Sequence, residues 1–210
     1  MIIKVCGMSD EENILEVAAL DVDWIGFIFW KGSKRYVRPE DVERIRALIP
    51  RKTVKTVGVF VNAAKEDTMR TAARCRLDYI QLHGDEQPGL CRSLRSSGLS
   101  VIKAFRIADA GALAGVTAYK GAADYYLFDT PCEGYGGSGM TFDWQVLDSY
   151  NGQTPFLLSG GLNPGSVPAL ERFHHPRLAG IDLNSGFETA PGLKDVARLA
   201  HFTRSIANRQ

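Results

Sequence analysis

The sequence alternates from end to end between short apolar runs and longer stretches with the apolar spacing of a helix. Eight runs are rich in β-branched and aromatic residues, at residues 2–5, 24–29, 54–61, 79–82, 101–105, 125–128, 156–158 and 180–183. They read as continuous apolar runs rather than as a clean alternation of apolar and polar residues, which is typical of parallel strands that are buried on both faces. This repeated pairing of strand and helix constrains the fold more than any other feature.

Helix start signals lie between these runs. Four of them are an N-cap residue or a proline at the first helical position: Ser9 with Glu12, Pro39, Asp143 and Asn163. The last helix is expected over residues 193–207. The even spacing leaves no room for a linker, so we expect one domain over residues 1–210.

Eight strand–helix units in 210 residues predict a single (β/α)₈ TIM barrel, an α/β fold of about 200–250 residues. An open, doubly wound parallel sheet shares this alternation but usually has fewer strands. In a TIM barrel the active site forms where the loops that follow the strands meet. Residues that follow each predicted strand are therefore the candidates for function.

The composition excludes several classes of function. The formal net charge is +1, with 25 basic and 24 acidic residues well mixed, so no basic stripe indicates a nucleic-acid surface. No run approaches the roughly 18 apolar residues of a membrane span, and no signal peptide is evident, so we expect a cytoplasmic protein. Neither a disulfide framework nor a metal site is expected from the four scattered cysteines, Cys6, Cys75, Cys91 and Cys132.

Glycines follow the last two predicted strands. Gly160 and Gly161 come after the seventh, and Ser185 and Gly186 come after the eighth. In TIM barrels these two loops frequently bind phosphate through backbone N–H groups, which an anion approaches most closely at glycine. One glycine pair would indicate an ordinary turn, but two such loops predict a phosphate site. The glycine-rich stretch 134–139 fits either a loop that closes over a ligand or a plain surface loop.

Four side chains with acid–base or anion-binding chemistry also follow predicted strands. The Asp129 carboxyl is expected to be half-buried, which raises its pKa and lets it stay protonated as a general acid. Taken alone, it also fits a hydrogen-bonded structural aspartate. Cys6 alone fits a buried core thiol, and as a thiolate it fits a base or a nucleophile. Arg35 fits either a carboxylate ligand or a solvated charge. His83 fits a structural or a functional histidine equally well.

Seven motifs, in order along the chain, together resemble a known family. They are "KVCGM", "SKRYV", "VGVFVN", "QLHGDE", "DT…GYGGSGMTFDW", "LSGGLNP" and "DLNSGFETAPGLKD". They resemble phosphoribosylanthranilate isomerase, an enzyme of tryptophan biosynthesis, over about residues 3–196. The resemblance implies a TIM barrel that converts N-(5′-phosphoribosyl)anthranilate to 1-(2-carboxyphenylamino)-1-deoxyribulose 5-phosphate by an Amadori rearrangement, without metal or cofactor.

The resemblance also implies roles for particular residues. The family's general base falls on Cys6, its general acid on Asp129, and the arginine that holds the anthranilate carboxylate on Arg35. The remaining pocket positions fall on His83, Gly139 of the mobile loop, Gly160, Gly161, Ser185 and Gly186. One departure follows the eighth strand, where the common form "DVSSGVE" reads "DLNSGFE" and Asn184 replaces a serine. This departure bears on the details of the phosphate loop.

The rearrangement itself fits these residues. It needs an acid that protonates the ribose ring oxygen and a base that removes a proton from the neighbouring carbon, acting from opposite sides of one sugar. Strands one and six would bring Cys6 and Asp129 to opposite sides of the barrel mouth.

Two alternatives are weaker. The histidine-pathway isomerase would have an aspartate where Cys6 stands and a longer chain with an internal half-repeat. A barrel that only binds a phosphorylated ligand would not need both acid and base. The expected partner is a small phosphorylated substrate, with no nucleic acid and no membrane, and the chain is expected as either a monomer or a homodimer.

Overall fold

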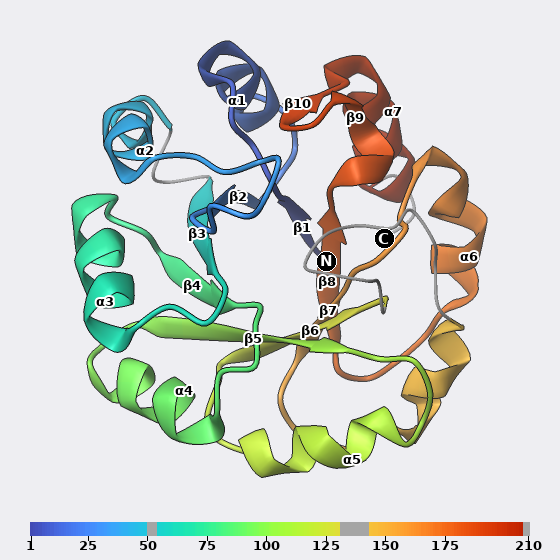
Figure 1. The fold of residues 1–210 in the computed structure, drawn as a ribbon. Helices are drawn as coiled ribbons and strands as arrows, with labels where there is room; N and C mark the ends of the chain where they lie inside the picture. The colour runs from blue at the N-terminus through green and yellow to red at the C-terminus, as the bar shows by residue number, and fades with distance from the viewer. Residues whose placement is uncertain (50–53, 131–142, 208–210) are drawn as a thin grey trace.

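Eight parallel strands close into a barrel in chain order (Figure 1). The computed structural model describes residues 1–49, 54–130 and 143–207. The strands are β1 Ile2–Val5, β2 Trp24–Ile28, β3 Lys55–Phe60, β4 Tyr79–Leu82, β5 Ser100–Arg106, β6 Tyr125–Asp129, β7 Phe156–Leu158 and β8 Leu178–Leu183. Because β1 pairs with both β2 and β8, the predicted TIM barrel is confirmed and the open sheet is excluded.

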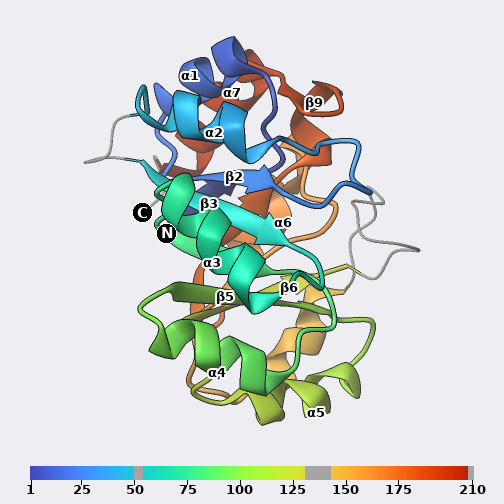
Figure 2. The same cartoon turned by 60° about the vertical axis from the view of Figure 1, so that its left-hand side comes forward.

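Helices surround the barrel, as Figures 1 and 2 show from two directions. They are α1 Glu11–Ala18, α2 Pro39–Arg46, α3 Lys65–Arg74, α4 Pro88–Ser96, α5 Ala112–Val116, α6 Val167–Arg172 and α7 Val196–Ala207. Short 3₁₀ helices lie at η1 Thr117–Tyr119, η2 Trp144–Ser149, η3 Pro164–Ser166 and η4 Ser185–Phe187. Within the described ranges, no helix is long and apolar enough to cross a membrane.

Three of the four helix start signals are confirmed. Pro39 occupies the first position of α2, Asn163 forms a capping box at η3, and Asp143 caps η2, although η2 is a 3₁₀ helix rather than an α-helix. The Ser9 signal is wrong by one residue. Asp10 caps α1 by accepting a hydrogen bond from the Asn13 backbone at 2.9 Å.

The prediction for the last helix is wrong at its start. Helix α7 begins at Val196 because the preceding residues, Leu193–Lys194, form strand β10. This strand pairs antiparallel with β9, Glu188–Ala190, in a small hairpin outside the barrel. The hairpin lies next to β8 in the chain, and it brings charged side chains to the barrel mouth.

Aromatic side chains fill the barrel at the amino ends of the strands. Trp24, Tyr79 and Tyr125 are the first residues of β2, β4 and β6. The Trp24 ring stacks on Tyr79 with 4.4 Å between centroids and meets Tyr125 edge-on at 5.3 Å. This packing contributes to the core at the end of the barrel opposite the mouth.

An aspartate precedes each of these three aromatic residues and ties its strand to the one before. Each carboxylate accepts a backbone N–H from the preceding strand: Asp23 from Ile3 at 2.7 Å, Asp78 from Thr56 at 2.8 Å and Asp124 from Val101 at 2.9 Å. Asp78 also receives a hydrogen bond from the buried guanidinium of Arg46 at 3.1 Å. Burial alone would raise the pKa of Asp78, but the Thr56 N–H and Arg46 outweigh it and lower the pKa.

We expect Asp78→Ala to lower the free energy of unfolding by about 1–3 kcal/mol, because it leaves buried donors without an acceptor. Urea denaturation measures the change, and the exposed Asp21→Ala is the control, expected within about 0.5 kcal/mol of the wild type. The pKa of Asp78 is lower in the folded state than in the unfolded state. Its carboxylate therefore adds to the free energy of unfolding above the ordinary carboxyl pKa, and this stabilisation is lost as pH falls through the lowered value. The stability difference between Asp78→Ala and wild type should therefore shrink in acid, and a pH-independent difference would contradict this explanation.

Candidate active site

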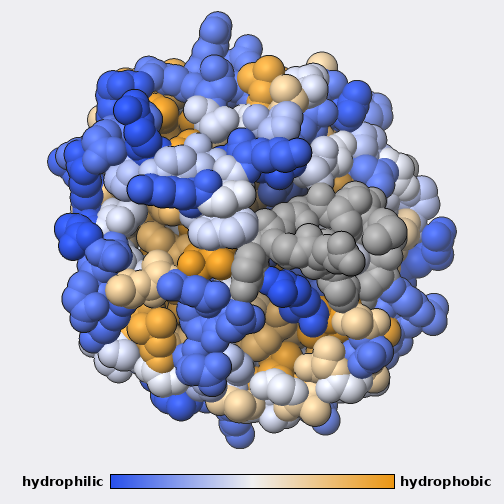
Figure 3. All heavy atoms as spheres, viewed as in Figure 1, coloured by the Kyte–Doolittle hydropathy of each residue, from blue (hydrophilic) through white to orange (hydrophobic). Residues whose placement is uncertain are grey.

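A pocket opens at the carboxyl ends of the strands. Figure 3 shows this face of the barrel, with hydrophilic side chains around the edge and hydrophobic ones nearer the centre. Seven of the nine site residues predicted from the sequence line the pocket: Cys6, Arg35, His83, Asp129, Gly160, Gly161 and Ser185. Gly186 is adjacent to Ser185 in η4, and Gly139 lies outside the described residues. The barrel therefore brings together candidates that are up to 179 positions apart.

Cys6 lies directly after β1, where its backbone N–H donates to the Leu183 carbonyl at 2.8 Å. Its side chain is 3% exposed. Two glycines make room for it. A Cβ at Gly26 would lie 2.7 Å from the Cys6 sulfur, and Gly7 has a left-handed φ of +73°. A Cβ at Gly7 would also lie 2.6 Å from the Arg35 side chain. Glycine at this position therefore permits the turn after Cys6 and leaves room for Arg35.

Asp129 contacts two groups at the end of β6. Its Oδ1 accepts the Thr130 backbone N–H at 2.9 Å, and its Oδ2 lies 3.4 Å from His83 Nε2. The other ring nitrogen, His83 Nδ1, lies 2.9 Å from the amide nitrogen of Gln81. Because an amide nitrogen can only donate, this contact leaves the proton of a neutral imidazole on Nε2, facing the carboxylate.

Gln81 was not predicted from the sequence, although it lines the pocket. The residue is 1% exposed, and its Oε1 has no hydrogen-bond partner within the described part of the chain. A buried amide oxygen without a partner is costly unless a donor forms a hydrogen bond to it. In a pocket wall, such an oxygen is suited to receive a ligand hydroxyl.

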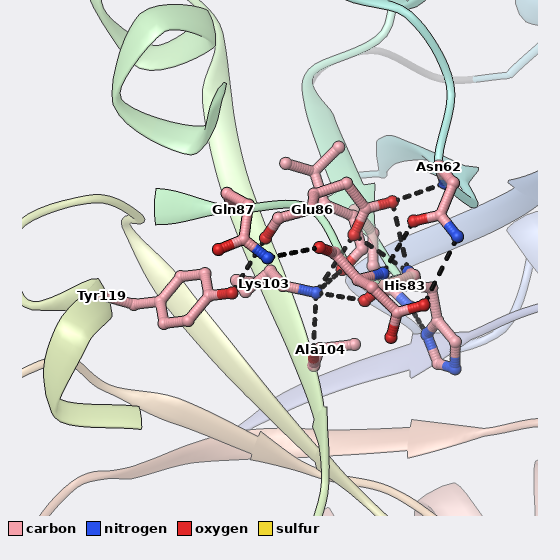
Figure 4. Close-up of polar contacts among 11 residues, drawn as sticks. Asn62, His83, Glu86, Gln87, Lys103, Ala104 and Tyr119 are labelled. Carbon is pink, nitrogen blue, oxygen red and sulfur yellow. Dashed lines mark hydrogen bonds and ion pairs between the residues drawn. The ribbon is translucent and has the colours of Figure 1, made fainter. Parts of the chain in front are cut away.

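The loop that carries His83 is fixed by a buried ion pair (Figure 4). Lys103 Nζ on β5 lies 3.1 Å from Glu86 Oε2 and donates to the Gly84 carbonyl at 2.7 Å. Glu86 in turn accepts the backbone N–H groups of Gly84 and Asn62, the latter at 2.8 Å. Both charged side chains are at most 2% exposed. The loop after β4 is thus held from β3 and β5, which orients His83 toward Asp129.

Arg35 reaches the pocket from the loop after β2 and is held in place by Glu188 of β9. Its Nε and Nη2 atoms donate to the two carboxylate oxygens at 2.7 and 2.6 Å, in a bidentate pair. Lys194 of β10 also lies 2.6 Å from Glu188. The hydrogen bond with Glu188 raises the pKa of Arg35. Burial would raise the pKa of Glu188, but Arg35 and Lys194 outweigh it and lower the pKa.

Asn184, the residue that departs from the common family form, belongs to the same network. Its Oδ1 accepts a hydrogen bond from Lys194 Nζ at 2.7 Å. The amide oxygen is therefore committed to a lysine of the β9–β10 hairpin.

Glycine is favoured in the loop after β7 by its backbone conformation and in the loop after β8 by close packing. Gly160 and Gly161 have φ values of +88° and +66°, which favour glycine. A Cβ at Gly186 would lie 2.1 Å from the Leu162 carbonyl, so the two loops touch each other there. Within the described ranges, the N–H groups of Gly160, Gly161, Ser185 and Gly186 donate no hydrogen bond. Free amides beside a pocket suit an anion.

The barrel order places these loops between the two titratable candidates. Cys6 follows β1 and Asp129 is the last residue of β6, and β7 and β8 separate those two strands on the shorter path around the barrel. A ligand with its anionic end on the β7 and β8 loops would therefore extend between the thiol and the carboxyl.

The closed barrel, with titratable side chains in a pocket at its mouth, has the arrangement of a TIM-barrel enzyme. The family model of N-(5′-phosphoribosyl)anthranilate isomerase matches residues 3–205. The chain belongs to that family.

Similarity to individual relatives extends over nearly the whole chain. An N-(5′-phosphoribosyl)anthranilate isomerase from Parabacteroides distasonis is 53% identical over 98% of this chain and 93% of its own. The crystal structure of the Thermus thermophilus phosphoribosylanthranilate isomerase superposes with a TM-score of 0.88 at 28% identity, with both chains fully covered. A phosphoribosylanthranilate isomerase bound to reduced 1-(o-carboxyphenylamino)-1-deoxyribulose 5-phosphate gives a TM-score of 0.86 at 32% identity over 99% of this chain and 100% of its own.

Proposed function

We propose that this chain isomerises N-(5′-phosphoribosyl)anthranilate to 1-(2-carboxyphenylamino)-1-deoxyribulose 5-phosphate, a step of tryptophan biosynthesis, with Cys6 as general base and Asp129 as general acid. One observation carries the assignment of roles: the thiol and the carboxyl line the same pocket, on either side of two glycine loops with free amides. The family match supports the reaction, and a related enzyme binds a reduced form of the product.

The two side chains would act in succession on one sugar. Asp129 gives its proton to the ribose ring oxygen, the bond from that oxygen to C1′ breaks, and the anilino nitrogen forms an iminium with C1′. Cys6 then removes the proton from C2′, and the electron pair neutralises the iminium to give an enolamine. Tautomerisation of the enolamine gives the 2-keto product. His83 lies 3.4 Å from Asp129 and would keep the carboxyl directed at the ring oxygen.

The substrate's two anionic ends have matching donors in the pocket. The phosphate would accept the free N–H groups of Gly160, Gly161, Ser185 and Gly186. The anthranilate carboxylate would bind Arg35, whose guanidinium is already oriented by its bidentate contact with Glu188. Fixing the guanidinium before the substrate arrives reduces the entropy lost on binding.

We expect Gly161→Val to weaken binding of a phosphorylated product analogue by roughly 10- to 100-fold, because a side chain at φ +66° displaces amides that hold the anion. Calorimetry measures this loss, and it should be absent for the same analogue without its phosphate. Gly98→Val is the matched control, since Gly98 also has a positive φ, +89°, but has no atom within 4 Å of its added Cβ. Equal losses for both analogues would show that Gly161 serves folding rather than phosphate binding.

A further inference from the structure

A cluster of buried charges lies beneath the pocket, around the sulfur of Cys6. Lys4 Nζ lies 2.8 Å from Asp182 Oδ1, with the lysine side chain fully buried and the aspartate 6% exposed. Lys194 and Glu188 form a second pair at 2.6 Å, with exposed fractions of 0% and 6%. Charges this deep are costly unless each one is compensated.

Neighbouring strands bring Lys4 and Asp182 to the same place as the thiol. Lys4 and Cys6 are two residues apart along β1 and its end, so their side chains project to the same side of the sheet. The register of β1 against β8 sets Lys4 directly opposite Asp182. Asp182 and Cys6 both line the pocket, and Lys4 lies under them.

The charges of this cluster do not balance while Cys6 is a neutral thiol. Three cationic groups, Lys4, Arg35 and Lys194, face two carboxylates, Asp182 and Glu188. Before the anthranilate carboxylate binds Arg35, one positive charge is left over in this cluster. A thiolate on Cys6 would neutralise it.

We propose that Lys4, held in place by Asp182, is the positioning residue that allows Cys6 to act as a base, because its buried ammonium compensates the charge of the thiolate. The inference rests on the role of Cys6 in the proposed function. Lys4 itself does not line the pocket, so it would affect the reaction only by its effect on the Cys6 sulfur.

The groups that face Cys6 shift the pKa of its thiol in opposite directions. Burial outweighs the other influences and raises the pKa of the Cys6 thiol above its ordinary value; Lys4 is the strongest influence that opposes this rise, Asp182 adds to it, and Lys194 opposes it. Arg35 also interacts with the sulfur, and Glu188 balances Arg35 and Lys194. Across the pocket, Asp129 raises the pKa of Asp182 and His83 lowers it.

The two members of the pair respond differently to burial: at the aspartate, burial outweighs Lys4 and raises the pKa of Asp182. Burial would lower the pKa of Lys4, but Asp182 and Cys6 outweigh burial and raise it. The ammonium thus keeps its charge inside the barrel, as the proposal requires.

The test is the pH dependence of iodoacetamide alkylation at Cys6, read by mass spectrometry of the peptide that contains it. Lys4→Met should move the midpoint to higher pH by about one unit or more, because it removes the compensating cation. Asp182→Asn, which is isosteric and expected to fold, should move the midpoint to lower pH. The double variant should lie between wild type and Lys4→Met, because Lys4 outweighs Asp182 in its effect on the thiol.

Lys103→Met is the matched control, since Lys103 is an equally buried barrel lysine with its own partner, Glu86. It should lower stability as Lys4→Met does, yet leave the alkylation midpoint of Cys6 where it is in the wild type. Wild-type midpoints in Asp182→Asn and in the double variant would overturn the proposal, as would an equal shift in Lys103→Met.

The pH profile of kcat/KM separates this proposal from the assignment of the base. If Cys6 is the base, the rise of kcat/KM with pH should shift in the same order as the alkylation midpoints. Midpoints that shift while the kinetic profile stays fixed would support the effect of Lys4 on the thiol and show that another group is the base.

Discussion

Cys6→Ala should lower kcat for N-(5′-phosphoribosyl)anthranilate by at least about 10²- to 10⁴-fold, the range for a lost acid–base group. Alanine removes only the sulfur at the end of β1, and its methyl group cannot take the proton from C2′. The phosphate loops and Arg35 do not depend on the sulfur, so KM should change much less than kcat. Steady-state turnover of the purified variant measures both constants.

A second buried cysteine provides the control for this substitution. Cys91 lies in α4, is fully buried and does not line the pocket. Cys91→Ala therefore removes the same atoms from the protein interior and should leave kcat near the wild-type value. Near-wild-type turnover by Cys6→Ala would show that the thiol is a packing group and that the base is elsewhere.

Asp129→Asn should reduce kcat by a comparable factor, about 10²- to 10⁴-fold. The amide is isosteric and can still accept the Thr130 N–H, so the end of β6 should keep its form. It has no acidic proton to give to the ribose ring oxygen, so the ring opens without assistance. The variant should fold normally and bind the phosphorylated product analogue as the wild type does.

The matched control for Asp129 lies at the other end of the same strand. Asp124 precedes β6. Its carboxylate accepts a hydrogen bond from the Val101 N–H at 2.9 Å and forms an ion pair with Arg95 at 2.8 Å. Residues at the amino ends of barrel strands serve stability, whereas those at the carboxyl ends serve catalysis. Asp124→Asn should therefore lower the unfolding free energy and keep kcat, and the reverse pattern in the two variants would refute the assignment of the acid.

The strands could be predicted because each is a mainly apolar run, and the observed strand ends differ from the predicted ones by at most two residues. The errors arise where local signals compete. Ser9 and Asp10 are both good N-cap residues, and only the fold selects Asp10, because Ser9 instead donates to the Gly192 carbonyl at 3.3 Å. The hairpin β9–β10 was missed because its strands are two or three residues long and pair outside the barrel.

The site could be predicted where its residues lie at the carboxyl end of a strand or directly after it, as Cys6, His83 and Asp129 do. The residues that were missed lie within strands. Lys4 and Gln81 are polar residues in otherwise apolar runs, and that exception was the available signal. Their partners could not be deduced, because Lys4 meets Asp182 only through the closure of β1 onto β8, across 178 positions of sequence.

The contact between Glu188 and Arg35 could not be predicted either, because the two residues are far apart in the sequence. It spans 153 positions and depends on the hairpin after β8. Sequence spacing identifies which side chains reach the mouth of a barrel, but the closed structure decides which of them are paired.

The central claim is that one pocket holds the phosphate on the β7 and β8 loops and the sugar between Cys6 and Asp129. A crystal structure of this chain with reduced 1-(o-carboxyphenylamino)-1-deoxyribulose 5-phosphate tests it most directly. We predict phosphate oxygens on the amides of these loops, the aromatic carboxylate on Arg35, and the thiol and carboxyl on opposite faces of the sugar chain. A ligand whose phosphate lies away from these loops, or whose sugar has both groups on one face, would contradict the account.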